Sequence, residues 1–143
     1  MVEDNPLMRD MLTEFLALEA SLEVVGVVES AEAALERFPV PSPDLVLIDM
    51  SLPGMSGMEL IRKLHEQQPG LPCAMLSGHG EKHYVEQAFD AGASGYILKG
   101  SRMNCRWQSS RYSLAKRSSA KSYSVSPRGR FAFSTCFHGP SPF

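Results

Sequence analysis

Short apolar runs alternate with amphipathic segments over residues 1–100, and this alternation restricts the fold more than any other feature. The runs are rich in Val, Ile and Leu, which is typical of buried strands. In the segments between them, apolar residues recur every three or four positions, which is typical of helices that pack one face. Strict alternation of helix and strand predicts βαβ units with right-handed crossovers. We therefore expect an α/β fold with a doubly wound parallel sheet.

The predicted elements follow one another as helix and then strand, from one end of this region to the other. Strands are predicted over 22–28, 44–50, 72–77 and 94–99, and helices from near Pro6 to Leu18 and over 30–38, 56–69 and 81–93. Ser30 is expected to cap the start of a helix, and Gly92 the end of another. A further strand at the start of the chain is represented only by Met1 and Val2, whereas strands usually have about five or six residues. We expect a truncated first strand or a late start codon.

Polar residues stand where the predicted strands end. Asp49, Ser77 and Lys99 each close a strand, and Glu3-Asp4 follows the first one. In open α/β sheets, ligands bind beyond the carboxyl ends of the strands. Taken singly, each residue also has a structural interpretation: an acidic turn before a helix, a turn serine, a solvated lysine, or an aspartate that caps the next turn. Because all of them fall at one edge of one sheet, the pattern favours a functional site.

The residue types at this edge suit phosphoryl chemistry. Three carboxylates repel one another unless a cation lies among them, and Mg²⁺ accepts carboxylate oxygens while keeping room for a phosphate oxygen. A carboxylate can also act as a nucleophile and form an aspartyl phosphate. Phosphoryl transfer needs positive charge and hydrogen-bond donors around the transferred group. The Lys99 ammonium and the Ser77 hydroxyl supply both.

Four segments of the chain resemble the receiver domain of bacterial two-component response regulators. They read VEDNP (2–6), VLIDMSLPGMSGMEL (46–60), MLSGHG (75–80) and GASGYILKG (92–100). The resemblance covers residues 1–100, and it extends to the branch that is usually joined to a helix-turn-helix output domain. It implies a five-stranded parallel sheet in the flavodoxin-like order 2-1-3-4-5, in which the truncated first strand is central.

The resemblance also implies a role for each residue at the strand ends. Asp49 would accept a phosphoryl group from the phosphohistidine of a sensor histidine kinase, in a two-component phosphorelay. The domain would be no separate enzyme, although it takes part in its own phosphoryl transfer and dephosphorylation. Glu3, Asp4, Asp49 and the backbone carbonyl of Ser51 would bind the cofactor Mg²⁺.

Three further residues complete the implied site. Ser77 and Lys99 would contact the phosphoryl group. Tyr96 matches the aromatic residue that turns inward when the hydroxyl at the position of Ser77 moves toward the phosphate, so both would form the switch. An aromatic side chain on an edge strand is the alternative interpretation of Tyr96.

The charge distribution divides the chain after residue 100. Residues 1–100 hold all 16 acidic residues and six of the 14 Lys and Arg, whereas 101–143 hold no acid and 11 serines. We expect an N-terminally incomplete receiver domain over 1–100 and a basic Ser/Arg-rich tail over 101–143. The fifth helix that should follow Lys99 has no recognisable counterpart. The tail is interpreted as sequence translated out of frame, or else as a disordered segment or a basic arm.

Other features bound the location and the partners. The three cysteines have neither disulfide nor metal spacing, no apolar run could span a membrane, and the protein is expected to be cytoplasmic. The tail is too short for an output domain, so contact with DNA would need a domain absent here. Without a fifth helix, apolar surface of the sheet would be exposed beside strand 94–99, which would be the edge of the sheet. This predicts self-association or a tail packed over the gap.

Two other functions remain open at this level. The basic tail could bind nucleic acid, which would make the chain a nucleic-acid-binding protein. The fold could also serve as a protein-interaction module that no longer switches. Phosphorylation of Asp49 distinguishes the receiver from both alternatives.

Overall fold

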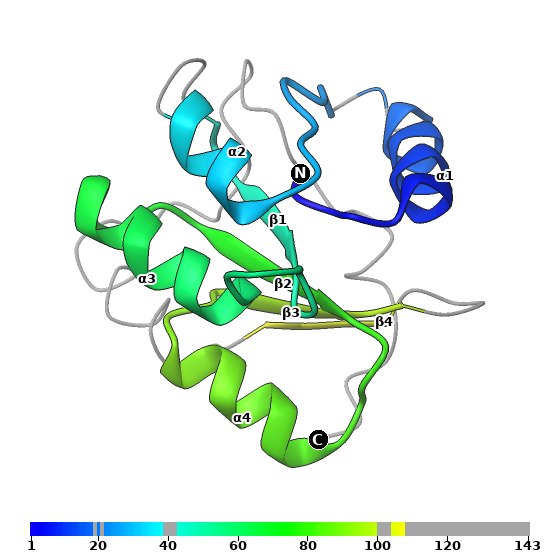
Figure 1. Ribbon diagram of the computed structural model, residues 1–143. Coiled ribbons are helices and arrows are strands. Elements are labelled where there is room, and N and C mark those ends of the chain that lie inside the picture. The colour runs from blue at the N-terminus through cyan, green and yellow to red at the C-terminus, as the bar shows by residue number, and fades with distance from the viewer. Residues whose placement is uncertain (19, 21, 39–42, 100–103, 108–143) are drawn as a thin grey trace, which may run out of the picture.

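The computed structural model describes residues 1–18, 20, 22–38, 43–99 and 104–107, and Figure 1 shows how their elements are arranged. In chain order, the elements are α1 (Pro6–Ala17), α2 (Ala31–Arg37), β1 (Val46–Asp49), α3 (Gly57–Gln67), β2 (Cys73–Ser77), α4 (Lys82–Asp90), β3 (Gly95–Leu98) and β4 (Asn104–Trp107). The strands form one sheet in the order β1-β2-β3-β4. The first three are parallel, and β4 runs antiparallel to β3.

Helices cover both faces of this sheet (Figure 1). On one face, Leu12 and Leu16 of α1 pack against Leu45 and Leu47, together with Ala74 of β2 and its neighbours. On the other face, α2, α3 and α4 pack against the alternate strand residues, which include Val46, Ile48, Cys73, Met75 and Tyr96. Both faces of the strands are therefore buried, which explains their uninterrupted apolar runs. The predicted doubly wound α/β fold with a parallel sheet is confirmed.

The predicted helix ends are also found. The Ser30 hydroxyl accepts a hydrogen bond from the backbone N–H of Ala33, 3.1 Å away, at the start of α2. Gly92 follows the C-cap residue Ala91 of α4 and has a φ of +109°, in the left-handed region that favours glycine. These contacts fix where the helices begin and end relative to the strands that carry the site.

The start of the chain pairs on both sides but forms no strand. Val2 makes isolated parallel bridges to Val28 and to Ile48. Its N–H donates to the carbonyl of Leu47 (2.8 Å), and its own carbonyl accepts from the N–H of Asp49 (2.9 Å). The prediction of a strand over 22–28 is wrong, because only Val28 pairs there. Val2 lies between its two partners as the order 2-1-3-4-5 requires, but the five-stranded order itself stays a prediction.

After β3 the structure differs from the sequence-based expectation. Strand 94–99 was expected at the sheet edge, but β4 pairs with β3, so that Leu98 lies opposite Asn104 and Gly95 opposite Trp107. An edge strand exposes unpaired backbone donors and acceptors, which any extended segment can satisfy. The expectations for the fifth helix and for the tail beyond 107 lie outside the described residues. Within the described part of the chain, no helix is long and apolar enough to cross a bilayer.

Candidate functional site

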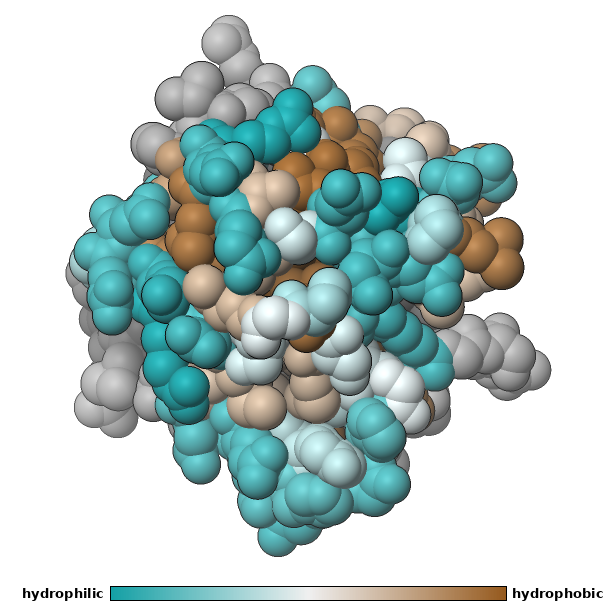
Figure 2. Space-filling model, viewed as in Figure 1, coloured by the Kyte–Doolittle hydropathy of each residue, from teal (hydrophilic) through white to brown (hydrophobic). Residues whose placement is uncertain are grey.

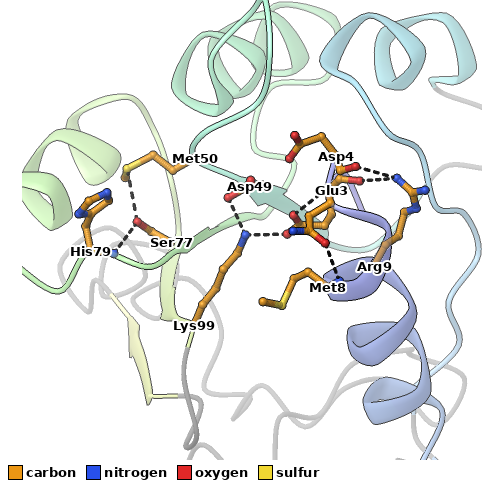
Figure 3. A network of polar contacts seen from close by, with 10 residues as sticks. Glu3, Asp4, Met8, Arg9, Asp49, Met50, Ser77, His79 and Lys99 are labelled. Carbon is orange, nitrogen blue, oxygen red and sulfur yellow. Dashed lines mark hydrogen bonds and ion pairs between the residues drawn. The ribbon is translucent and has the colours of Figure 1, made fainter.

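Three carboxylates converge at the carboxyl end of the strands (Figure 3). Glu3 and Asp4 follow the paired residue Val2, and Asp49 is the last residue of β1. One carboxylate oxygen from each lies within 4.8 Å of the others. Glu3 and Asp49 are buried, with 0% and 5% of their surface exposed, whereas Asp4 is exposed. Two carboxylates of the cluster are therefore buried, and the third faces solvent.

Lys99 reaches the same cluster from the end of β3. Its ammonium Nζ lies 2.7 Å from Oε2 of Glu3 and donates a hydrogen bond to Oδ1 of Asp49 at 2.9 Å. Burial alone lowers the pKa of Lys99, but the hydrogen bonds to Glu3 and Asp49 and the charges of both carboxylates outweigh it and raise the pKa above its usual value. At neutral pH the site thus holds a cation next to two buried carboxylates.

The remaining charges suit a divalent cation. Three carboxylates against one ammonium leave two negative charges uncompensated in this cluster. Oε2 of Glu3 is fully buried and has the Lys99 ammonium 2.7 Å away, which leaves a second lone pair of this oxygen for another cation. A buried carboxylate oxygen with a free lone pair is a suitable ligand for Mg²⁺. The residues present therefore fit a Mg²⁺ site.

Backbone contacts hold Asp49 in place. The N–H of Asp49 donates to the carbonyl of Val2, and the next N–H, that of Met50, donates to Leu76 (2.8 Å). A Cβ at Gly57, the first residue of α3, would lie 2.2 Å from the carbonyl oxygen of Asp49. Only a glycine allows α3 to begin so close to this strand end. The strand-end pattern in the sequence did not single out Gly57, although its position directly after Ser56, the N-cap residue of α3, was a signal.

Arg9 holds the segment that carries the other two acids. Its Nη1 donates to the backbone carbonyls of Glu3 (3.0 Å) and Asp4 (3.3 Å). The side chain of Asn5 caps α1 by accepting from the N–H of Met8, and the N–H of Asn5 donates to Oε1 of Glu3 (3.3 Å). Arg9 is a second residue that the sequence did not single out, because its contact is to backbone oxygens.

Ser77 and Tyr96 form a second polar group beside the carboxylates. The Ser77 hydroxyl is buried, accepts from the N–H of His79 (3.0 Å), and donates to Sδ of Met50 (3.6 Å). The Tyr96 hydroxyl donates to the carbonyl of His79 (2.6 Å). Burial raises the pKa of Tyr96, against the opposing hydrogen bond with Ser77. Tyr96 as a whole is 2% exposed and lies in the core.

The structure brings most of the predicted residues to one edge of the sheet. Glu3, Asp49 and Lys99 touch one another, and Asp4 lies beside them. Ser77 lies on the neighbouring strand, where the adjacent residue Leu76 pairs with Asp49. Ser51 lies in the turn after β1 and is exposed. The functional role of each residue stays a prediction.

A family model described as the response regulator receiver domain matches residues 1–105. The chain belongs to the response regulator receiver domain family. Receiver domains are signalling modules of two-component systems, in which histidine kinases phosphorylate them. They bind Mg²⁺ at an acidic pocket. The carboxylate cluster of this receiver domain has the composition that such a pocket needs.

Curated relatives and a solved structure agree with this family. The chain is 36% identical over 98 residues to the transcriptional regulatory protein DegU of Brevibacillus brevis, covering 68% of this chain and 42% of the relative. It is 35% identical over 99 residues to the DNA-binding transcriptional activator DevR/DosR of Mycobacterium tuberculosis, covering 69% and 46%. The receiver domain of the response regulator NarL from Mycobacterium tuberculosis superposes with a TM-score of 0.65 at 34% identity, over 71% of this chain and 82% of that chain.

The similarity to these relatives covers only part of their length. This receiver domain spans less than half the length of DegU and of DevR/DosR. Both are named as transcriptional regulators, which agrees with the branch that the sequence resembles. The shared part is the receiver, and the similarity reaches no further along those proteins.

Proposed function

We propose that Asp49 is the phosphoacceptor of a two-component response regulator. A carboxylate oxygen of Asp49 would attack the phosphorus of a phosphohistidine on a sensor histidine kinase. The new O–P bond forms as the N–P bond breaks, and the imidazole nitrogen keeps the bonding pair and takes up a proton. The observation that carries this proposal is the Lys99 ammonium, which touches both Asp49 and Glu3 at the carboxyl edge of the sheet.

Glu3, Asp4, Asp49 and the Ser51 carbonyl are the proposed Mg²⁺ ligands. A bound Mg²⁺ would offset negative charge on the phosphoryl oxygens. Glu3 and Asp49 supply the buried oxygens, while the exposed carboxylate of Asp4 leaves the cluster open to solvent on one side. That opening is where a phosphodonor would approach.

Lys99 and Ser77 are proposed to hold the transferred group. The ammonium is already 2.9 Å from Asp49, so a phosphoryl oxygen on that carboxylate would lie within its reach. The Ser77 hydroxyl now donates to a thioether sulfur, which is a weak acceptor, and a phosphoryl oxygen would be a stronger one. Phosphorylation would therefore draw this hydroxyl away from Met50.

Ser77 and Tyr96 are proposed to act together as the switch. Both contact His79: Ser77 accepts from its N–H, and Tyr96 donates to its carbonyl. A movement of Ser77 toward Asp49 would therefore displace the backbone of His79, whose carbonyl accepts the hydrogen bond from Tyr96. The output itself, including any contact with DNA, would come from an output domain, and the protein would act in the cytoplasm.

The test of this function is phosphorylation of the folded chain. Acetyl phosphate with Mg²⁺ should add the mass of one phosphoryl group, and Asp49→Asn should prevent the addition. Asp44→Asn is the matched control, because Asp44 is an exposed aspartate just before β1 and should leave the modification unchanged. An unmodified wild-type chain whose circular dichroism shows a folded domain, or equal modification of the Asp49→Asn variant, would contradict the proposal.

A further inference from the structure

We propose that Arg9 is a positioning residue of the metal site, which it serves by fixing the backbone that carries Glu3 and Asp4. This inference rests on the proposed Mg²⁺ site. Arg9 lies in α1, and among the described residues its guanidinium forms no ion pair with the carboxylates of the cluster. Its Nη1 donates instead to the carbonyl oxygens of Glu3 and Asp4, at 3.0 Å and 3.3 Å (Figure 3).

Sheet pairing stops just before these two carbonyls. The N–H of Glu3 donates to the carbonyl of Val28, and this is the last of the backbone hydrogen bonds that pair the chain start with Val28 and β1 in the described part of the chain. From there to the start of α1, the chain turns away from the sheet. A backbone carbonyl that is no longer paired with a neighbouring strand needs another hydrogen-bond donor. Here one guanidinium donates to two consecutive carbonyls. Arg9 therefore replaces the sheet as the support for the two acids.

The anchoring helix is itself fixed to the same turn. The backbone N–H of Arg9 donates to the carbonyl of Asn5 (2.9 Å), and the Arg9 carbonyl accepts from the Thr13 hydroxyl (2.7 Å). Below it, Leu12 and Leu16 are buried against the sheet. The guanidinium thus links the acidic turn to a helix that the core holds still. This linkage reduces the freedom of both acids before a cation binds.

Positioning and charge make opposite predictions for Arg9. A guanidinium beside an acidic cluster repels a second cation, so its charge alone weakens Mg²⁺ binding. Its hydrogen bonds hold two ligands in place and strengthen Mg²⁺ binding. Removing both the charge and the donors should therefore tighten binding if charge dominates, and weaken it if positioning dominates.

The experiment measures the dissociation constant of Mg²⁺ by titration calorimetry on the full chain, using Arg9→Met, Arg9→Lys and Arg37→Met. Arg9→Met should raise Kd about fivefold, on the order expected from the loss of backbone hydrogen bonds. Arg9→Lys keeps the charge but loses the planar guanidinium that serves both carbonyls, so it should recover only part of the affinity. Arg37→Met is the matched control: Arg37 donates to the carbonyl of Val27 (3.4 Å), outside the acidic turn, and its loss removes the same charge.

Each outcome decides the inference. A Kd for Arg9→Met equal to or lower than that of the unsubstituted chain would overturn it, since charge alone would then explain Arg9. If Arg9→Met fails to fold in chelator, Arg9→Lys decides: a raised Kd supports the inference and an unchanged one overturns it. A wild-type chain that binds no Mg²⁺ overturns the proposed metal site as well. A wild-type chain that binds Mg²⁺ and is phosphorylated on Asp49, with Kd unchanged in Arg9→Met, overturns the role of Arg9 alone.

Discussion

The ammonium of Lys99 lies 2.7 Å from Oε2 of Glu3. The residue that directly follows β3 therefore contacts the start of the chain. The same ammonium reaches Asp49 at 2.9 Å. Two buried carboxylates are thus paired with one cation, and either would be left uncompensated without it. Lys99 therefore has a structural role before any phosphate is present.

Lys99→Met is expected to destabilise the fold. Removing one partner from a buried ion pair typically costs about 3–5 kcal/mol, because the remaining charges are left without compensation. Mg²⁺ should recover part of this loss in the variant, since it can take the place of the ammonium between Glu3 and Asp49. Urea unfolding with and without Mg²⁺ measures both effects. Lys63→Met, at an exposed pair with Glu59, is the control and should change little.

The pKa of Lys99 predicts a loss of stability at alkaline pH. Its folded pKa is raised above the ordinary value of 10.5, so the folded state holds its proton more tightly than the unfolded state. The stabilisation is fully present below about pH 10.5 and is lost as the pH rises through the folded pKa. The free energy of unfolding should therefore fall more steeply above pH 10.5 in the wild type than in Lys99→Met. Parallel curves for the two proteins would argue against this linkage.

Mg²⁺ should raise the thermal midpoint of the wild type. At a hundredfold excess over Kd, a ligand that binds only the folded state adds about 2.7 kcal/mol. Asp49→Ala removes a buried ligand from the cluster and should show little or no rise. Scanning calorimetry over a series of Mg²⁺ concentrations measures the shift. An equal rise in both proteins would place the ion elsewhere.

Gly57→Ala should destabilise the domain although it lies in a helix. Glycine to alanine inside a helix usually gains about 1 kcal/mol from helix propensity. At Gly57 the added methyl would meet the carbonyl oxygen of Asp49 at 2.2 Å, so the strand end or α3 must move. A lower urea midpoint and weaker Mg²⁺ binding are expected. Gly26→Ala is the control, because nothing lies within 4 Å of a methyl there; a midpoint no lower in Gly57→Ala than in this control would contradict the close contact.

The outer face of α1 predicts self-association. Leu7, Met11, Phe15 and Leu18 are 77%, 52%, 41% and 83% exposed, and Figure 2 shows apolar side chains protruding where α1 lies in Figure 1. Exposed apolar patches commonly mark association sites. Sedimentation velocity should show association that rises with concentration, and the double variant Leu7→Gln/Leu18→Gln should weaken it. Glu14→Gln, on the same helix, is the control; a wild type that stays monomeric at all concentrations contradicts the prediction.

The clustering of these residues could be predicted from the sequence because Asp49 and Ser77 end strands, Lys99 directly follows one, and Glu3 and Asp4 follow the paired residue Val2. Strand ends are marked by the change from apolar to polar residues, and parallel strands bring those ends to one edge. Gly57 and Arg9 could not be found in this way. Each acts through a contact with backbone oxygens five to eight residues away, and no hydrophobic periodicity marks such a contact.

The sheet was harder to predict than the site. Residues 22–28 have strong strand propensity, yet a strand forms only where a partner offers enough backbone, and the chain start offers only the residues around Val2. The reverse happened at β4, whose sequence carries no strand pattern. Its backbone pairs with β3, whose edge offers free backbone donors and acceptors.

The chain start is hydrogen-bonded on two sides by very few residues, and these bonds couple the proposed metal site to local opening of the chain start. Val28 bonds to Met1 and Glu3, while Leu47 and Asp49 bond to Val2. A local opening that breaks these bonds would separate Glu3 and Asp4 from Asp49, so we expect the site and the pairing of the chain start with β1 to open as one cooperative unit. Any cation held there slows that opening, and the amide protons of Val2, Glu3 and Asp49 would exchange with solvent together. Occupancy of the site is therefore expected to set how often the chain start separates from β1.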